Sequence, residues 1–207
     1  ATMLIAVPTG VKVFNWITTM YRGSLTFETP MLFSIAFVIL FTFGGFTGMM
    51  LSIAAADMQY HDTYFVVAHF HYVMVAGAVF SGTAAVYYWL PKWCGKMYNE
   101  TMGKVQFWIA FIGFNITFMP QHFLGLAGMP RRYADYGLQF ADWNMVSSIG
   151  AFMYGGAQIL FLFNVIRTIG WGKPTNDSQV WEGAEGLEWT LPTPAPYHTF
   201  STPPEVK

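Results

Sequence analysis

The chain has 207 residues, of which 54% are hydrophobic and only 10% are charged, against about 25% charged in ordinary soluble domains. The net charge of −1 gives no strongly basic or acidic surface, and the one cysteine, Cys94, permits no intramolecular disulfide. The composition therefore excludes a soluble enzyme, a nucleic-acid binder and a disulfide scaffold, and it predicts an integral membrane protein.

Five apolar stretches predict an all-α bundle of transmembrane helices. A spanning helix needs roughly 20 apolar residues, and these stretches meet that need, the first interrupted only by Lys12. In chain order they are Thr2–Tyr21, Met31–Ala56, Thr63–Pro91, Val105–Pro130 and Trp143–Ile166. Because the apolar pattern already runs at Met3, we expect a truncated first helix in a piece of a longer polypeptide. Residues 1–170 would form the bundle and residues 171–207 an extramembrane tail on the inner side.

Charges in the loops predict the orientation of the bundle. The loops after the second and fourth stretches are acidic, whereas the segments after the other three are basic. The acidic residues are Asp57, Asp62, Asp135 and Asp142, and the basic ones are Arg22, Lys92, Lys96, Lys104, Arg167 and Lys173. The positive-inside rule places the basic end in the cytoplasm or matrix. Arg131 and Arg132 break this pattern on the outer side, either as a pair that meets lipid head groups or as a site for anions.

Two histidines, His69 and His71, lie inside the third stretch. Ionisable groups inside a membrane are costly and usually functional. Positions i and i+2 of a helix project about 200° apart, so the two rings cannot share one metal but can each hold a metal centre on opposite faces. Phe70 lies between them in sequence, and this arrangement favours electron transfer between two cofactors through one helix. The alternative is a pair of core histidines that bind carbonyl groups.

His61 and Asp62 lie at the outer end of the same stretch. Asp62 could cap the helix. Alternatively, the two side chains could supply one nitrogen and one oxygen to a divalent ion, with a partner chain or water completing the ligands. The doublet Arg131-Arg132 belongs to the same face, where guanidinium groups would bind the anionic propionates of haems held by the two histidines below.

Lys12 interrupts the first stretch about 15 Å from its inner end, a depth that does not favour snorkelling. Thr9 lies one turn earlier on the same helix face. A hydroxyl and an amine in this position predict a proton pathway that enters from the inner side. The alternative is a structural lysine paired with a carboxylate on a helix outside this sequence.

Ordered motifs along the whole chain closely resemble subunit I of the haem–copper oxidases. The matching runs are Val7–Phe14, His61–Tyr64, Ala68–Val73, Pro120–Gly125, Gly128–Tyr133, Leu187–Trp189 and Pro196–Phe200. The resemblance implies that the chain corresponds to helices eight to twelve of a twelve-helix subunit.

The resemblance also implies a role for each residue near the haems. His69 would be the proximal ligand of the high-spin haem at which oxygen is reduced, and His71 an axial ligand of the low-spin haem. Phe70 would lie between the haems, and Arg131 and Arg132 would bind their propionates.

Further roles follow from the same resemblance. His61 and Asp62 would bind Mg or Mn at the contact with subunit II, which in this family contributes a glutamate. Asp57 would lie near the propionates, and Lys12 and Thr9 would belong to the lysine proton pathway.

The types of residue at Asp62, Tyr72 and Pro120–Phe123 resemble the branch that oxidises cytochrome c, with two haems of the a type. The copper ligands of the family lie on earlier helices, so the resemblance implies a chain that works only beside the N-terminal part of subunit I. Further partners would be subunit II, other oxidase subunits, cytochrome c, oxygen and lipid, but no nucleic acid. The expected activity is oxygen reduction to water coupled to proton pumping, in a bacterial plasma membrane or mitochondrial inner membrane.

Three other interpretations stay open. A quinol oxidase fragment would share the fold and differ in its haem absorbance. A non-redox proton-coupled transporter would use Lys12 as its proton carrier, although it would need neither the run His69-Phe70-His71 nor the outer arginines. A disrupted gene product without partners is the third.

Overall fold

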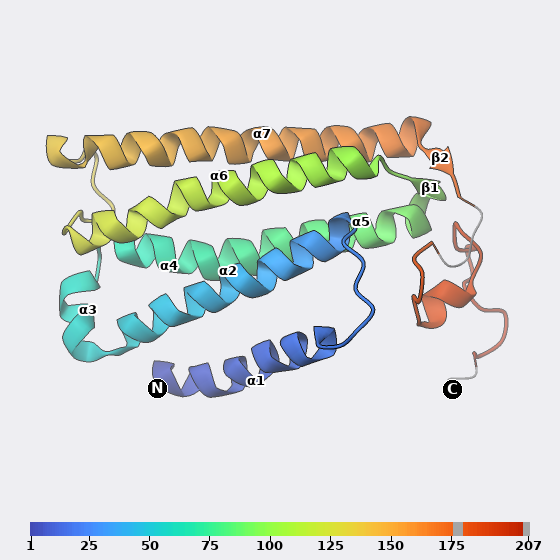
Figure 1. Ribbon diagram of the computed structural model, residues 1–207, viewed down its shortest axis with the longest axis horizontal. Coiled ribbons are helices and arrows are strands. Elements are labelled where there is room, and N and C mark those ends of the chain that lie inside the picture. The colour runs from blue at the N-terminus through green and yellow to red at the C-terminus, as the bar shows by residue number, and fades with distance from the viewer. Residues whose placement is uncertain (176–179, 205–207) are drawn as a thin grey trace.

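The computed structural model describes residues 1–175 and 180–204, and most of its regular structure is helical. Long helices lie side by side and run between the two ends of a bundle (Figure 1). In chain order the elements are α1 (Thr2–Met20), α2 (Thr29–Ser52), α3 (Ala54–Tyr60), α4 (Tyr64–Val75), the π-helical turn η1 (Ala76–Phe80), α5 (Ser81–Cys94), β1 (Lys96–Met97), α6 (Glu100–Leu126), η2 (Leu138–Phe140), α7 (Ala141–Trp171), β2 (Lys173–Pro174) and η3 (Leu187–Thr190). The predicted all-α membrane bundle is confirmed.

All five predicted stretches are helical, and within the described residues four helices are long and apolar enough to cross a membrane. These four are α2, the continuous run Tyr64–Cys94, α6, and Leu138–Trp171. Helix α1 has 19 residues, includes Lys12 and buries none of its side chains, and it is not among the four. The first predicted span is therefore confirmed as a helix, and its passage through a membrane stays a prediction.

Several helix ends differ from the ends of the predicted stretches; α6, for example, covers Glu100–Leu126 rather than Val105–Pro130. Helix α2 stops at Ser52 because Ile53 takes an extended conformation (φ −84°, ψ 109°), and the chain then restarts as the short helix α3. The next helix begins at Tyr64 and is capped by Thr63, whose side-chain oxygen accepts a hydrogen bond from the backbone N–H of Phe65. Asp62 is therefore not the cap, because its φ of +53° differs from the extended conformation of an N-cap residue.

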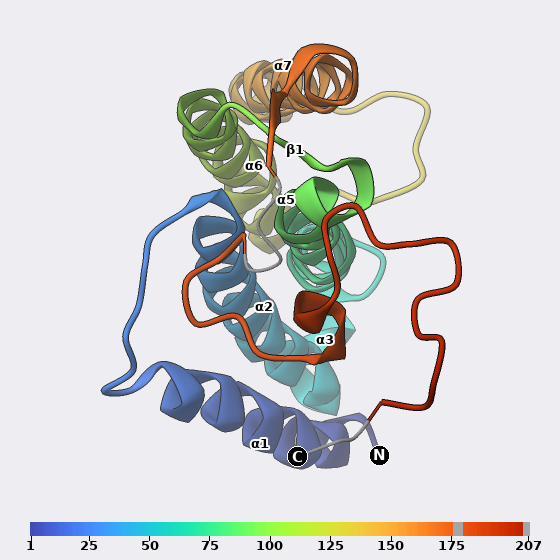
Figure 2. The ribbon, with the colours of Figure 1, turned by 90° about the vertical axis from the view of Figure 1, so that its right-hand side faces the viewer.

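Glycines let the long helices approach one another closely. A Cβ added at Gly125 of α6 would lie 2.0 Å from the backbone nitrogen of Phe65 in α4. A Cβ added at Gly150 of α7 would lie 2.5 Å from the backbone nitrogen of Thr117 in α6. Small residues of this kind are how helices pack in lipid, where apolar burial supplies little driving force. Helix α4 thus contacts α2 on one side and α6 on another, and α7 packs along α6 (Figure 2).

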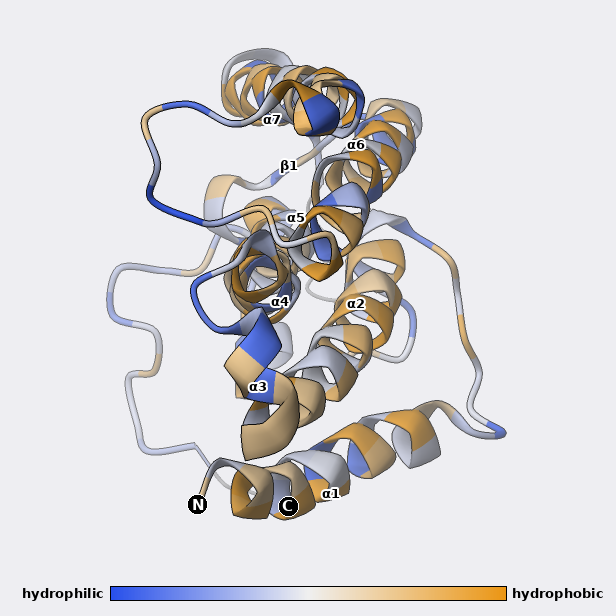
Figure 3. Ribbon diagram, turned by 90° about the vertical axis from the view of Figure 1, so that its left-hand side faces the viewer, coloured by the Kyte–Doolittle hydropathy of each residue, from blue (hydrophilic) through white to orange (hydrophobic). Residues whose placement is uncertain are grey.

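The loops gather at two opposite ends of the bundle. One end carries α3 and the connection from α6 to α7, and hydrophilic residues lie in these segments between mainly hydrophobic helices (Figure 3). The other end carries the connections from α1 to α2 and from α5 to α6, and the residues that follow α7 (Figure 1). The acidic and basic loops predicted from the charge pattern therefore lie at different ends. Which end faces the cytoplasm or matrix stays a prediction.

The residues after α7 fold back onto the basic end. Strands β1 and β2 pair antiparallel, with Lys96 opposite Pro174. The Trp181 indole donates a hydrogen bond to the Tyr88 carbonyl (2.8 Å), and the Lys92 ammonium donates to the Leu191 carbonyl (2.6 Å). Trp189 is 2% exposed. Helix α7 ends at Trp171, close to the predicted start of the tail, and the extramembrane location of the tail stays a prediction.

We expect Trp189→Ala to release this tail from the bundle. Loss of a buried tryptophan costs about 3–5 kcal/mol, which should speed protease cleavage after α7 by on the order of 100- to 1,000-fold, because cleavage follows local opening. Limited proteolysis of the assembled complex measures this rate. Tyr197→Ala is the control, since Tyr197 is 95% exposed. Equal cleavage of the two variants would contradict the packing described here.

Candidate functional site

His69 of α4 is held by one face of α2. Its Nδ1 atom lies 2.9 Å from the Gly44 carbonyl oxygen and 3.2 Å from the Thr47 hydroxyl oxygen. A Cβ added at Gly48 would lie 2.6 Å from the Cε1 atom of His69. Because Nδ1 faces a carbonyl, we assign the proton to Nδ1, which leaves Nε2 with a lone pair. A neutral imidazole with this tautomer is a competent metal ligand.

His69 also borders a cavity of about 400 Å³ between α1, α2 and α4. Its walls are mainly apolar, from residues such as Phe14, Phe41 and Met49, and Thr9 adds a hydroxyl. A mostly apolar cavity with few polar groups is typical of a cofactor site. Sequence reasoning did not identify this cavity, because its walls come from helices far apart along the chain.

His71 faces a different neighbour. Its Nδ1 lies 2.7 Å from the carbonyl oxygen of Val67 in its own helix, and its ring stacks on Phe118 of α6 with centroids 4.1 Å apart and planes 16° apart. Phe70 also stacks on this ring, at 4.4 Å. The contacts of His69 with α2 and of His71 with α6 agree with the predicted opposite projection of the two side chains.

The predicted outer-face residues come together at the end of the bundle that carries α3. The backbone N–H of Arg131 donates to the Asp62 carbonyl (2.8 Å), and the Arg131 side chain lies 4.0 Å from an Asp62 carboxylate oxygen. The two ring nitrogens of His61 lie 3.7 Å from Asp57 and 3.5 Å from Asp62. Arg132 is exposed and has a left-handed backbone with a φ of +65°.

This outer cluster does not by itself complete a metal site. No group of three or more His, Cys, Asp or Glu side chains with suitable geometry occurs among residues 1–175 and 180–204. His61 and Asp62 can supply two ligands, one nitrogen and one oxygen, and a divalent ion needs more. Magnesium or manganese binding by this pair therefore stays a prediction, in which a partner chain or water completes the ligands.

Thr9 and Lys12 differ in their surroundings. Thr9 is half-buried and borders the cavity of His69, whereas Lys12 is exposed and does not line it. The Lys12 ammonium lies 5.6 Å from the centre of the Trp16 ring. The structure thus connects the hydroxyl of the predicted proton pathway to the cavity, and the role of Lys12 stays a prediction.

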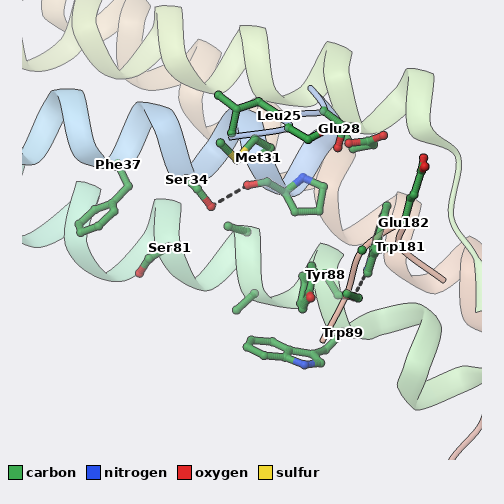
Figure 4. A pocket seen from close by; sticks show the side chains of 17 residues that line it. Leu25, Glu28, Met31, Ser34, Phe37, Ser81, Tyr88, Trp89, Trp181 and Glu182 are labelled. Atoms are coloured by element: carbon green, nitrogen blue, oxygen red, sulfur yellow. Dashed lines mark hydrogen bonds between the residues drawn. The ribbon is translucent and has the colours of Figure 1, made fainter. Parts of the chain in front are cut away.

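A second cavity, of about 480 Å³, lies at the basic end, between the start of α2, α5 and the tail (Figure 4). Tyr88, Trp89 and Trp181 line it together with the carboxylates of Glu28 and Glu182. None of the site residues predicted from the sequence lines this cavity. Cavity volume alone therefore does not identify a chemical site in this chain.

Comparisons with known proteins identify the family of this chain. Residues 1–153 match the family model described as Cytochrome C and Quinol oxidase polypeptide I. The chain is 53% identical over 206 residues to cytochrome c oxidase subunit 1 of Cereibacter sphaeroides, a match that covers 99% of this chain and 36% of that protein. It is 51% identical over 210 residues to the same subunit of Bacillus sp. strain PS3, covering 100% and 34%.

A heme-copper terminal oxidase dimer solved by cryo-EM shares the fold, with a TM-score of 0.61, 16% identity, and coverage of 84% of this chain and 31% of that one. The chain spans about a third of the length of the curated relatives that it matches, at 36% and 34%. The family expected from the motifs is thus confirmed, and the chain belongs to the cytochrome c and quinol oxidase polypeptide I family.

Proposed function

We propose that this chain is part of the catalytic subunit of a cytochrome c oxidase. The complex would pass electrons from cytochrome c to oxygen, reduce the oxygen to water and couple the reaction to proton pumping. The observation that carries this proposal is that His69 lies against α2 and its cavity while His71 lies against α6, on opposite sides of one helix. Relatives named as cytochrome c oxidase subunit 1 support it.

The two histidines would each supply one axial nitrogen to a haem iron. His69 suits the high-spin haem because its Nδ1 is bound to the Gly44 carbonyl and its ring borders the cavity. His71 suits the low-spin haem, and Phe70 would lie between the two centres. When bound, the haems supply electron transfer and a site for oxygen, while the surrounding hydrogen bonds and packing tune the iron. We propose haem a for both, with copper held by ligands outside this chain.

The outer cluster, formed by Asp57, His61, Asp62, Arg131 and Arg132, would bind the anionic propionates of the haems and a nearby divalent ion. Arg131 and Arg132 would bind haem propionates, with Asp57 near them, because guanidinium groups bind carboxylates bidentately. His61 and Asp62 would bind Mg or Mn together with a carboxylate of subunit II. The contact between Arg131 and Asp62 supports a shared site, since it ties the two loops together.

Lys12 and Thr9 would carry protons from the inner side toward the cavity of His69. The complex would include the N-terminal part of subunit I, subunit II and other oxidase subunits, in a bacterial plasma membrane or mitochondrial inner membrane. We infer that the chain alone is inactive. A quinol oxidase is the second candidate because the matching family model covers both branches, and the absorbance of haem a against haem b separates them.

Alanine substitutions should separate the two helical histidines. In the assembled complex, His69→Ala should remove or distort the high-spin haem and abolish carbon monoxide binding, since one axial nitrogen would be lost there. His71→Ala should disturb the low-spin haem first. Absorbance spectra of the reduced enzymes, with and without carbon monoxide, measure both effects.

His198→Ala is the control for this pair, because His198 is exposed in the tail and should leave both spectra intact. Identical spectral losses from the two helical variants would count against two centres. Normal spectra in both would mean that these are core histidines, and the proposed function would fail.

Lys12→Met should slow reduction of the high-spin haem while both haem spectra remain in place. Methionine keeps a similar side-chain volume and removes the exchangeable proton, and loss of a proton-transferring group costs about 100-fold or more. Stopped-flow reduction at neutral pH gives the rate. Lys104→Met should leave the rate unchanged, because Lys104 lies at the basic end beside Glu100 at 3.6 Å. An unaltered rate in Lys12→Met would reject the pathway.

A further inference from the structure

Two polar groups lie within hydrogen-bond distance of the Gly44 carbonyl oxygen on α2. The Thr47 hydroxyl oxygen lies 2.9 Å from this carbonyl oxygen, and the Nδ1 atom of His69 lies at the same distance from it. The hydroxyl oxygen and Nδ1 are themselves 3.2 Å apart. The three groups therefore form a closed hydrogen-bonded triangle between α2 and α4.

The direction of each bond follows from the chemistry of the donors. If His69 is a metal ligand through Nε2, its Nδ1 carries the ring proton and can only donate. The Thr47 hydroxyl then has one acceptor for its own proton, the Gly44 carbonyl. That carbonyl accepts from both groups, and Nδ1–H is divided between the carbonyl and the hydroxyl oxygen. Thr47 is 6% exposed, so water does not readily replace either bond.

The ring of His69 has little freedom to leave this triangle. Gly48 follows Thr47 directly, and the ring edge occupies the space that a Cβ at Gly48 would fill. Gly44 is similarly tight, because a Cβ there would lie 2.9 Å from the Cβ of Tyr72. Positions 44, 47 and 48 fall on one helix face, since residues three and four apart are neighbours. This face of α2 therefore fixes the plane of the imidazole.

We propose that Thr47 is a positioning residue for His69 that weakens the bond between Nδ1–H and the Gly44 carbonyl by occupying part of the carbonyl's accepting capacity. This inference rests on the proposed role of His69 as an axial haem ligand. A hydrogen bond from the outer nitrogen of a metal-bound histidine raises the basicity of the ring, and through it tunes the iron. Thr47 would limit that effect.

Loss of the Thr47 hydroxyl would have two opposite effects on the bond between Nδ1–H and the Gly44 carbonyl. It would remove a donor that competes for the carbonyl, and it would remove a second acceptor for Nδ1–H. The lengths of the two contacts of the hydroxyl indicate which effect is larger. The bond from the hydroxyl to the carbonyl has a normal length of 2.9 Å, whereas the 3.2 Å contact from Nδ1 to the hydroxyl is at the long limit. Removing the competing donor should therefore outweigh removing the weak second acceptor. Nδ1–H would bind the carbonyl more strongly, and the ring would become a stronger electron donor.

Thr47→Val tests this inference in the assembled, haem-loaded complex, because valine keeps the shape and lacks the hydroxyl. The expected result is a higher iron–histidine stretching frequency in the resonance Raman spectrum of the reduced high-spin haem, with a lower midpoint potential for that haem. Thr47→Ser keeps a hydroxyl at this position, so its stretching frequency and midpoint potential should stay close to those of the unmodified protein. Thr47→Ala, which adds no bulk, provides the same test if the valine variant does not assemble.

Thr42→Val is the matched control. Thr42 belongs to the same helix as Thr47 and lines the cavity that His69 borders, and its hydroxyl donates to the Val38 carbonyl (2.7 Å) rather than to the triangle. It should leave the stretching frequency unchanged. An unchanged or lower frequency in the variants that lack the Thr47 hydroxyl would overturn the inference while the proposed function stands. An intact high-spin haem in His69→Ala would instead overturn both.

Discussion

Helix α4 carries two histidines that each need a hydrogen-bond partner, and it must also pack closely against α2 and α6. The arrangement of these helices follows from this constraint. His69 and His71 project in different directions, and the interior of a membrane protein leaves few polar groups to receive a ring N–H. The structure supplies one carbonyl from α2 for His69 and one from α4 itself for His71. Helix α2 can reach the ring because Gly48 has no side chain, and α6 can reach α4 because Gly125 has none.

The positions of the helices could be predicted from the sequence, whereas their ends could not. Long apolar runs without charges are rare outside membrane spans, so each run predicted a helix that the structure contains. The break at Ile53 has no proline or glycine to announce it. The cap at Thr63 could not be separated from a cap at Asp62, because both residue types are good caps. The pairing of this loop with Met129 and Arg131 settles the backbone there, and such pairing is tertiary.

The candidate site also has residues that could be selected from the sequence and supporting residues that could not. Residues that are unusual for their surroundings, such as histidines in an apolar run or arginines at an acidic end, could be selected from the sequence alone. The structure brings Arg131 to Asp62 as the charge pattern suggested. The support for His69 could not be selected, because Gly44 and Thr47 lie more than twenty residues away, at separations of 25 and 22. Small residues one helical turn apart on α2 are the one local signal of such a close approach.

The surroundings of the two histidines differ in a way that supports different tasks for them. The ring of His71 packs on Phe118 and Phe70, and its Nδ1 is bound within its own helix, so its position depends on α4 and on aromatic contacts. The ring of His69 borders a cavity and depends on a polar contact from another helix. Both rings are half-buried, so burial alone does not separate them. If both histidines hold haem irons, as proposed, the hydrogen bond from His69 to α2 would give the protein a means of adjusting one centre through a neighbouring helix, which the bond of His71 within its own helix does not offer.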